Sequence, residues 1–204
     1  MRREPLILLV LVSVVCIVLG VAPTADRFTW LLENLPVLIA MPILIATWRR
    51  FPLTPLAYRL LALHAVVLMV GGHWTYAEVP AGHWVKDWLN LARNPYDRLG
   101  HLVQGFGPVI LARELLVRHD VLRRGAWAVA VLLLVVLGIS AAYELIEWQA
   151  AIWSGAAADA FLGSQGDVWD SQWDMACALI GATAALVLLG RMHDRQLADL
   201  TPAP

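Results

Sequence analysis

Several ionisable side chains stand where the sequence turns from polar to strongly apolar, in the stretch from Arg93 to Gln104. Asn94 and Pro95 favour the start of a helix there, as N-cap and first helical residue. On that helix Asp97 and His101 lie four residues apart on one face. A carboxylate and an imidazole in this arrangement suit a divalent cation or general acid–base chemistry.

Two later segments have the same character. Glu144 and Glu147 are three residues apart, and Asp170 and Asp174 are four apart, so each pair shares a helical face. Ionisable groups at a hydrocarbon boundary cost several kcal/mol unless they are paired, hydrated or metal-bound. We therefore expect the three segments to meet. Glu144 and Glu147 fall in the last turn of a helix predicted to end near residue 148, where the helix dipole disfavours anions.

These residues define a candidate site with three kinds of role. Carboxylates and an imidazole would hold a divalent cation such as zinc, manganese or iron, one glutamate would act as general base, and a basic side chain would contact an anionic headgroup. The predicted metal ligands are Asp97, His101, Asp170 and Asp174; the catalytic residues are Glu144 and Glu147; the substrate-binding residues are Arg98 and His73.

Structural alternatives exist for each of these residues. Asp97, Arg98 and His101 also suit a salt-bridge and capping cluster, and acids in the first turn of a helix are favourable caps. No compact motif such as His-Glu-x-x-His is present. The other histidines have plainer predictions: His83 as an interfacial surface residue, His64 as a packing residue of an apolar helix, and His119 and His193 as solvated loop residues.

The composition shows what must carry this site. Of 204 residues, 60% are hydrophobic and only 15% are charged, which indicates an integral membrane protein. A formal net charge of −1 gives no reason to expect nucleic acid as a partner. Both cysteines, Cys16 and Cys177, lie inside apolar runs, so a disulfide framework is not expected.

The predicted fold is all-α, a single membrane domain over residues 1–204 with six transmembrane helices and a short interfacial helix between the third and fourth. Each apolar segment is close to the roughly 20 residues that cross a bilayer. The interfacial helix, His83 to Leu91, places Trp84 and Trp88 at helical spacing against polar residues. The six segments cover about residues 6–22, 30–47, 56–72, 95–117, 126–148 and 171–190.

Basic residues predict the orientation. With the amino terminus in the cytoplasm, the 15 basic residues fall on the cytoplasmic side except for Arg27, Lys86, Arg93 and Arg98. This asymmetry matches the positive-inside rule and puts both termini in the cytoplasm. Most of the acids and most of the ten tryptophans then gather on the outer side.

Four motifs together resemble the YjdF-like family of bacterial inner-membrane proteins, and the resemblance covers nearly the whole chain. It implies a polytopic inner-membrane protein and carries no established biochemical activity. The motifs are Gly72-His73-Trp74-Thr75-Tyr76, Asn94-Pro95-Tyr96-Asp97-Arg98-Leu99-Gly100-His101, Tyr143-Glu144-Leu145-Ile146-Glu147-Trp148, and the run from Gly166 to Met175.

A fainter, architectural likeness is to VanZ-like membrane proteins. They carry an Asp-Lys-x-x-His-like helix start, an acid ending the next helix, and an Asp before a small-residue helix. Here Arg98 stands where lysine is usual, and Asp174 stands in place of a later asparagine. The likeness implies an outward-facing polar site near the envelope and lends no reaction.

Three functions follow from these residues. The leading hypothesis is metal-dependent chemistry on an envelope lipid or lipid-linked substrate at a periplasm-facing pocket; membrane lipid is then a partner, and a small molecule is an alternative substrate. The second is a proton- or cation-coupled transporter. The third is a membrane scaffold in which the cluster is structural. Below Gln104, Ser140 and Cys177 the last three segments become apolar, which favours a site over a conduit.

Overall fold

The computed structural model describes residues 3–154 and 164–200, and every element in these two ranges is a helix. This confirms the all-α prediction. The elements are α1 (Arg3–Val21), α2 (Arg27–Thr47), α3 (Pro55–Trp74), the short 3₁₀ helix η1 (Tyr76–Glu78), α4 (Pro80–Leu89), α5 (Tyr96–Phe106), α6 (Pro108–Arg118), α7 (Ala126–Ser154) and α9 (Asp170–Leu200).

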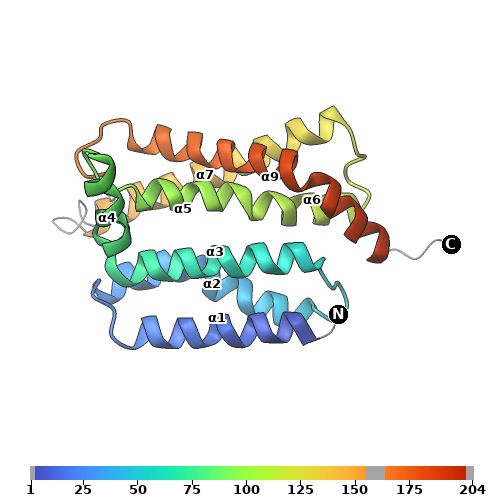
Figure 1. Ribbon diagram of the computed structural model, residues 1–204, viewed down its shortest axis with the longest axis horizontal. Coiled ribbons are helices and arrows are strands. Elements are labelled where there is room, and N and C mark those ends of the chain that lie inside the picture. Colours follow the sequence, from blue (N-terminus) through green and yellow to red (C-terminus); the bar gives the residue numbers. More distant parts are fainter. Residues whose placement is uncertain (1–2, 155–163, 201–204) are drawn as a thin grey trace.

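The long helices run along one axis in two layers, as Figure 1 shows. One layer holds α1, α2 and α3, and the other holds α5, α6, α7 and α9, with α3 packed against α5 between them. The short helix α4 lies across one end of the bundle. The start of α1 and the end of α9 lie at the opposite end (Figure 1).

Five of these helices, α1, α2, α3, α7 and α9, are long and apolar enough to cross a membrane. The prediction of one continuous fourth helix over 95–117 is wrong, because the chain forms α5 and α6 there, each of 11 residues. Pro108 causes the break: it has no N–H to donate to the carbonyl of Gln104, and its ring crowds that carbonyl. The two helices follow one another along one line (Figure 1).

Close contact between α5 and α9 depends on glycines. A Cβ on Gly105 would lie 1.8 Å from the carbonyl oxygen of Ala178, and a Cβ on Gly181 would lie 2.0 Å from that of Leu102. Neither separation is sterically allowed, so the two backbones approach only because these side chains are absent. Small residues allow the same close approach between transmembrane helices in general.

Asn94 joins the connections at the α4 end of the bundle and precedes the first turn of α5. Its side-chain oxygen accepts the N–H of Tyr96 at 3.0 Å, and its amide donates to the carbonyls of Ala77 (2.9 Å) and Val79 (3.0 Å). The helix begins at Tyr96 with Pro95 at the N-cap, one position later than predicted. Asn94 is completely buried, so its local capping role is joined to a long-range one.

Several helices are longer than the hydrophobic segments that predicted them. Helix α7 continues to Ser154 and α9 to Leu200, and α4 begins at Pro80 rather than at residue 83. Glu144 and Glu147 therefore lie inside α7, not in its last turn. The predicted argument from an adverse helix dipole is wrong for both residues, since the dipole acts only within the terminal turn.

A buried polar cluster joins α3, α6 and α9 at the end of the bundle opposite α4. Glu114 is fully buried and accepts hydrogen bonds from Thr54, both N–H (3.0 Å) and hydroxyl (2.7 Å), and from Arg118 (2.8 Å). His193 is also fully buried, so the prediction of a solvated loop residue is wrong. Arg113 donates to its Nδ1 at 2.9 Å, so Nε2 carries the proton and donates to Glu114 at 3.1 Å.

Candidate functional site

The packing face between α5 and α9 also carries the candidate site. On α5 the face holds Asp97, His101 and Gly105, each four residues from the next. On α9 it holds Asp174 and Ala178 in the same spacing. Because Gly105 lies against Ala178, the residues one and two turns away on both helices must face each other. The glycine contact therefore brings the carboxylates of the two helices together.

Three side chains meet closely enough to share a metal ion. Asp97, His101 and Asp174 each offer one ligand atom, and these atoms all lie within 4.8 Å of one another. Glu144 from α7 lies beside this group: its Oε1 is 3.8 Å from His101 Nε2, and Asp97 Oδ1 is 3.7 Å from the same nitrogen. Two ligands on a tetrahedral zinc ion with bonds of about 2.1 Å would be roughly 3.4 Å apart.

Gln104 sets the state of the imidazole. His101 Nδ1 lies 2.8 Å from Gln104 Oε1, which can only accept, so Nδ1 carries the hydrogen and donates it. Nε2 then presents a lone pair toward the carboxylates of Asp97 and Glu144. Metal-binding histidines usually have their second ring nitrogen fixed by a hydrogen bond in this way.

Two carboxylate oxygens in this group have no hydrogen-bond donor within residues 3–154 and 164–200: Asp174 Oδ1 and Glu144 Oε1. Asp174 is only 2% exposed, so water does not compensate it freely. A buried carboxylate oxygen without a donor is costly, and a bound cation or proton removes that cost.

Arginines neutralise the rest of the acidic cluster. Arg93 donates to Asp170 and, at 3.2 Å, to Asp97 Oδ2. Arg98 donates to Asp167 at 2.6 Å, and its guanidinium lies 5.2 Å from the ring centre of Trp173. The charge of Arg98 is thus already matched within the protein.

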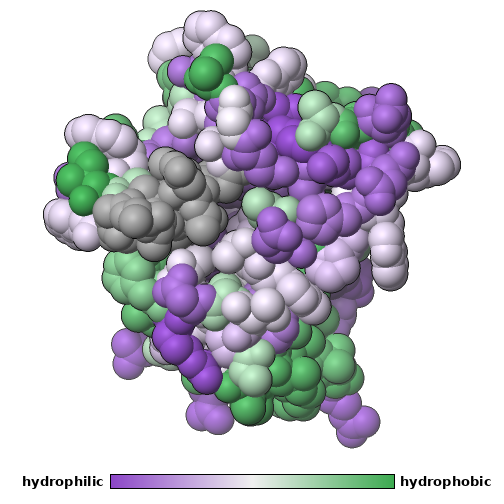
Figure 2. All heavy atoms as spheres, turned by 90° about the vertical axis from the view of Figure 1, so that its left-hand side faces the viewer, coloured by the Kyte–Doolittle hydropathy of each residue, from purple (hydrophilic) through white to green (hydrophobic). Residues whose placement is uncertain are grey.

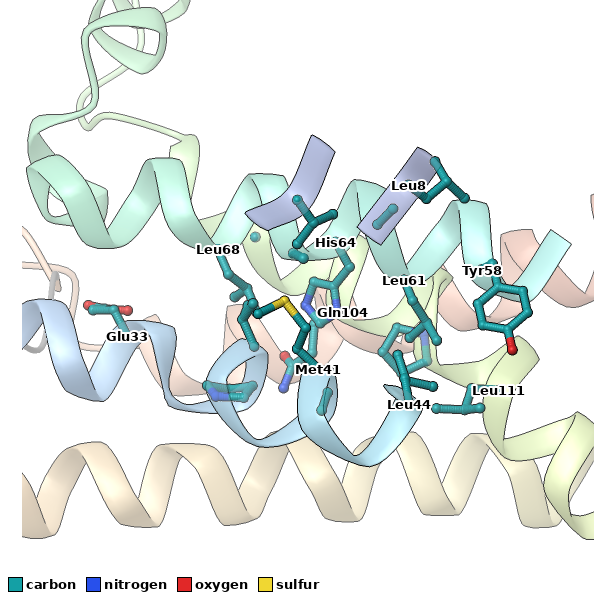
Figure 3. Close-up of a pocket in the computed structure, with 18 of the residues that line it drawn as sticks. Leu8, Glu33, Met41, Leu44, Tyr58, Leu61, His64, Leu68, Gln104 and Leu111 are labelled. Carbon is teal, nitrogen blue, oxygen red and sulfur yellow. The ribbon is translucent and has the colours of Figure 1, made fainter. Parts of the chain in front are cut away.

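A cavity of about 460 Å³ begins beside these residues and continues between α1, α2, α3, α6 and α7. Its polar end is lined by Glu33, Asp97, His101 and Glu147, and most of its remaining wall is apolar. Figure 3 shows Glu33 at one end and Tyr58 and Leu111 at the other. The volume lies within the range of small-molecule sites.

The structure places the predicted residues differently. Asp97, His101, Asp174 and Glu144 come together, and Glu147 lines the cavity. Asp170 is paired with Arg93, and Arg98 is paired with Asp167. His73 contacts the end of α1 instead, where its Nδ1 lies 2.8 Å from the carbonyl oxygen of Leu19. Its own carbonyl accepts the N–H groups of Thr24 and Ala25, so it fixes the connection between α1 and α2.

Sequence reasoning assigned no role to Arg93, Gln104 or Glu33. The spacing of Gln104 could have predicted its place in the site, because it lies three residues after His101 on the same helical face. Glu33 could have been predicted as well, because it is an acid inside an apolar segment. Arg93 had a local signal only for Asp97, four residues on, and none for Asp170, which is 77 residues away.

The site lies beneath the end of the bundle that α4 covers. Figure 2 looks onto this end and shows hydrophilic side chains gathered in its upper half, with hydrophobic ones below. On α4 itself Trp84 and Trp88 are 75% and 82% exposed. Exposed tryptophans on a short amphipathic helix are typical of a membrane interface.

Residues 4–195 of the chain match the sequence profile of a family described as "Predicted membrane protein (DUF2238)". The chain is also 55% identical over 172 residues to the inner membrane protein YjdF of Escherichia coli strain K12, and the matched region covers 84% of this chain and 82% of that relative. No solved structure matches the chain. The resemblance drawn from the four motifs is confirmed.

Proposed function

We propose a function from the premise that this chain belongs to the DUF2238 family of predicted membrane proteins. In this proposal the protein holds a divalent cation between α5, α7 and α9 and uses it for chemistry on an envelope lipid or lipid-linked substrate. Asp97, His101 and Asp174 are the ligands, with Glu144 as the fourth. Asp170 holds Arg93 in place beside them.

The environment of Asp174 is the main support for this proposal. Asp174 is almost completely buried, one of its oxygens has no donor in the described part of the chain, and it lies in the group of three ligand atoms that are within 4.8 Å of one another. A purely structural acid in this position would be expected to pair both oxygens, as Glu114 does at the other end of the bundle.

The remaining groups supply the chemistry around the cation. A divalent cation polarises a bound oxygen and stabilises developing negative charge. Glu147 lines the adjoining cavity and is the candidate general base for water or a substrate hydroxyl. Carboxylates with one imidazole suit zinc, manganese or iron.

Metal analysis of the purified protein tests this function. We expect about one equivalent of zinc, manganese or iron after loading and desalting, and a loss of at least about tenfold in affinity for Asp174→Asn, because a ligand with an unsatisfied oxygen is removed. Asp87→Asn, which changes an exposed acid of α4, is the matched control. Equal metal content in wild type and Asp174→Asn would overturn the proposal.

The alternative hypothesis, a membrane scaffold with a purely structural cluster, is supported by the ion pairs of Arg93 and Arg98 with Asp170, Asp97 and Asp167. The two hypotheses predict different effects on the stability of the protein. If the cluster only joins helices, Asp174→Asn relieves an unpaired carboxylate and raises or preserves the unfolding temperature without metal. If the cation is bound, metal raises the unfolding temperature of wild type and not of the variant.

We also propose the membrane arrangement that this function needs. Residues 96–118, counted through α5 and α6, span about 34 Å at helical rise, enough for the roughly 30 Å hydrocarbon core, so the two short helices together form a sixth crossing. The chain is then a single domain in the bacterial inner membrane, α4 lies in the outer interface, and the positive-inside rule puts both termini in the cytoplasm.

A further inference from the structure

The cavity beside the site is long and narrow. Its lining follows α2 from Glu33 to Trp48, a length of about 22 Å at 1.5 Å per residue. The same cavity is lined by α3 from Tyr58 to Leu68. A volume of about 460 Å³ spread over this length leaves room for one extended chain.

Its walls change in character along this length. Figure 3 shows Met41, Leu44 and Leu61 along the middle of the cavity, together with His64 and Gln104, between Glu33 at one end and Tyr58 and Leu111 at the other. Apart from these two polar side chains the wall there is apolar, and apolar surface offers none of the two to four polar partners that ordered water needs. The middle therefore suits a hydrocarbon.

Among acidic and strongly basic residues, only acids line the cavity in the described part of the chain, and they lie at one end of it. Glu33, Asp97 and Glu147 line the polar end, and no lysine or arginine within residues 3–154 and 164–200 lines any part of the cavity. Among charged ligand groups, this end favours one that brings a positive charge or that reaches the acids through a bound cation. A free fatty acid or a bare phosphate head would be repelled.

We infer that this cavity binds a single hydrocarbon chain of an amphiphile, with the end of the chain at Trp48, Tyr58 and Leu111 and a positively charged or cation-bound head group at Glu33, Asp97 and Glu147. The inference rests on the proposed function for the identity of the head, because a phosphate head requires the cation held by Asp97, His101 and Asp174. The position of the chain follows from the cavity itself.

Photo-crosslinking in lipid nanodiscs tests this placement. The probes are an n-alkyl amine and an n-alkyl phosphate of equal chain length, each with a diazirine at the end of the chain. We expect both to label the peptides that contain Trp48, Tyr58 or Leu111, which peptide mass spectrometry identifies. The amine labels them without metal, and the phosphate labels them only after metal loading.

Leu61→Trp and Leu63→Trp form the matched pair of variants. Leu61 lines the cavity, whereas Leu63 lies two residues away on the same helix and is 51% exposed. Filling the cavity with an indole should reduce labelling of those peptides by at least about tenfold, as overpacking does; the exposed substitution should leave it unchanged. The inference would be overturned if both variants were labelled equally. It would also be overturned if the labels were spread over lipid-exposed residues outside the cavity.

Metal content, measured on the same samples, separates the two proposals. If the protein binds no metal even after loading, the proposed metal chemistry is removed, and labelling by the amine probe still supports the chain site. Bound metal without labelling at the far end of the cavity would remove the chain site alone.

Discussion

At the scale of single residues, the site depends on how one imidazole is oriented. His101 faces Asp97 and Glu144 through Nε2 only because its other nitrogen donates to Gln104. The distances of 3.7 and 3.8 Å are too long for hydrogen bonds, so the three groups are close without satisfying one another. A cation among them, as proposed above, would satisfy all three groups.

Gln104→Leu tests this orientation. The substitution keeps the size of the side chain and removes the acceptor for Nδ1–H, so the imidazole loses its fixed tautomer. We expect metal affinity to fall about 10- to 100-fold, as for other residues that orient a metal-binding histidine. Competition against a chromogenic chelator measures the change.

Gln104→Glu is the rescue variant, because a carboxylate oxygen accepts the same hydrogen bond. Its metal affinity should stay close to that of wild type. If Gln104→Leu binds metal as tightly as wild type, His101 is not oriented by this bond and its assignment as a ligand loses its basis.

At the scale of elements, the contact between α5 and α9 decides which acids meet. Gly105 and Gly181 let the two backbones touch, and the carboxylates lie on the same faces one or two turns away. By contrast, a Cβ on Gly138 of α7 would meet nothing within 4 Å. Gly105 and Gly181 are therefore required for close contact between helices, whereas Gly138 is not.

Gly181→Leu should separate the two helices, since even its Cβ would lie 2.0 Å from the carbonyl oxygen of Leu102. We expect destabilisation of about 3 kcal/mol or more, at the upper end of the cost of overpacking, together with loss of metal binding. Thermal unfolding in detergent and metal titration measure the two effects.

Gly138→Leu is the control for the loss of a helical glycine as such. It should be neutral or slightly stabilising, because leucine favours the helix more than glycine does. If both variants behave alike, contact between α5 and α9 is not what holds the site together.

At the scale of the whole molecule, the two ends of the bundle differ in whether their buried charged groups have hydrogen-bond partners. Around Glu114 each buried group meets a partner: Thr54, Arg118 and His193 satisfy the carboxylate, and Arg113 satisfies the imidazole. At the other end Asp174 and Glu144 keep unpartnered oxygens among the residues described. The buried groups at the first end satisfy one another, whereas the unpartnered oxygens at the second end are what the proposed cation would bind.

The sixth crossing gives a prediction at this scale. If α5 and α6 cross the membrane together, α4 and the connection before α7 lie on opposite sides. In a Cys16→Ser, Cys177→Ser background, Asp87→Cys should react with a membrane-impermeant maleimide on intact spheroplasts. Val121→Cys, at a position 64% exposed, should react only after permeabilisation.

Two labelling results would contradict the proposed membrane arrangement. Labelling of both cysteines from outside would mean that α5 and α6 enter and leave on one face, with five crossings in total. Labelling of Val121→Cys alone would reverse the orientation predicted from the basic residues.

Local periodicity was sufficient to predict the all-α fold and five of the long helices. Apolar runs of membrane length located α1, α2, α3, α7 and α9, and the spacing of Asp97 with His101 and of Asp170 with Asp174 put each pair on one face. These features depend only on residues within a few turns of one another. The break at Pro108 was equally local, although the apolar character of residues 105–117 hid it.

Only the tertiary structure decided which acids share a partner. Glu144 faces His101 while Glu147 lines the cavity, and Asp170 pairs with Arg93 while Asp174 joins Asp97. These choices depend on the rotation and separation of helices far apart in sequence, which the glycine contacts between α5 and α9 set. Spacing along a helix determines the face of a residue, and packing between helices determines what that face meets.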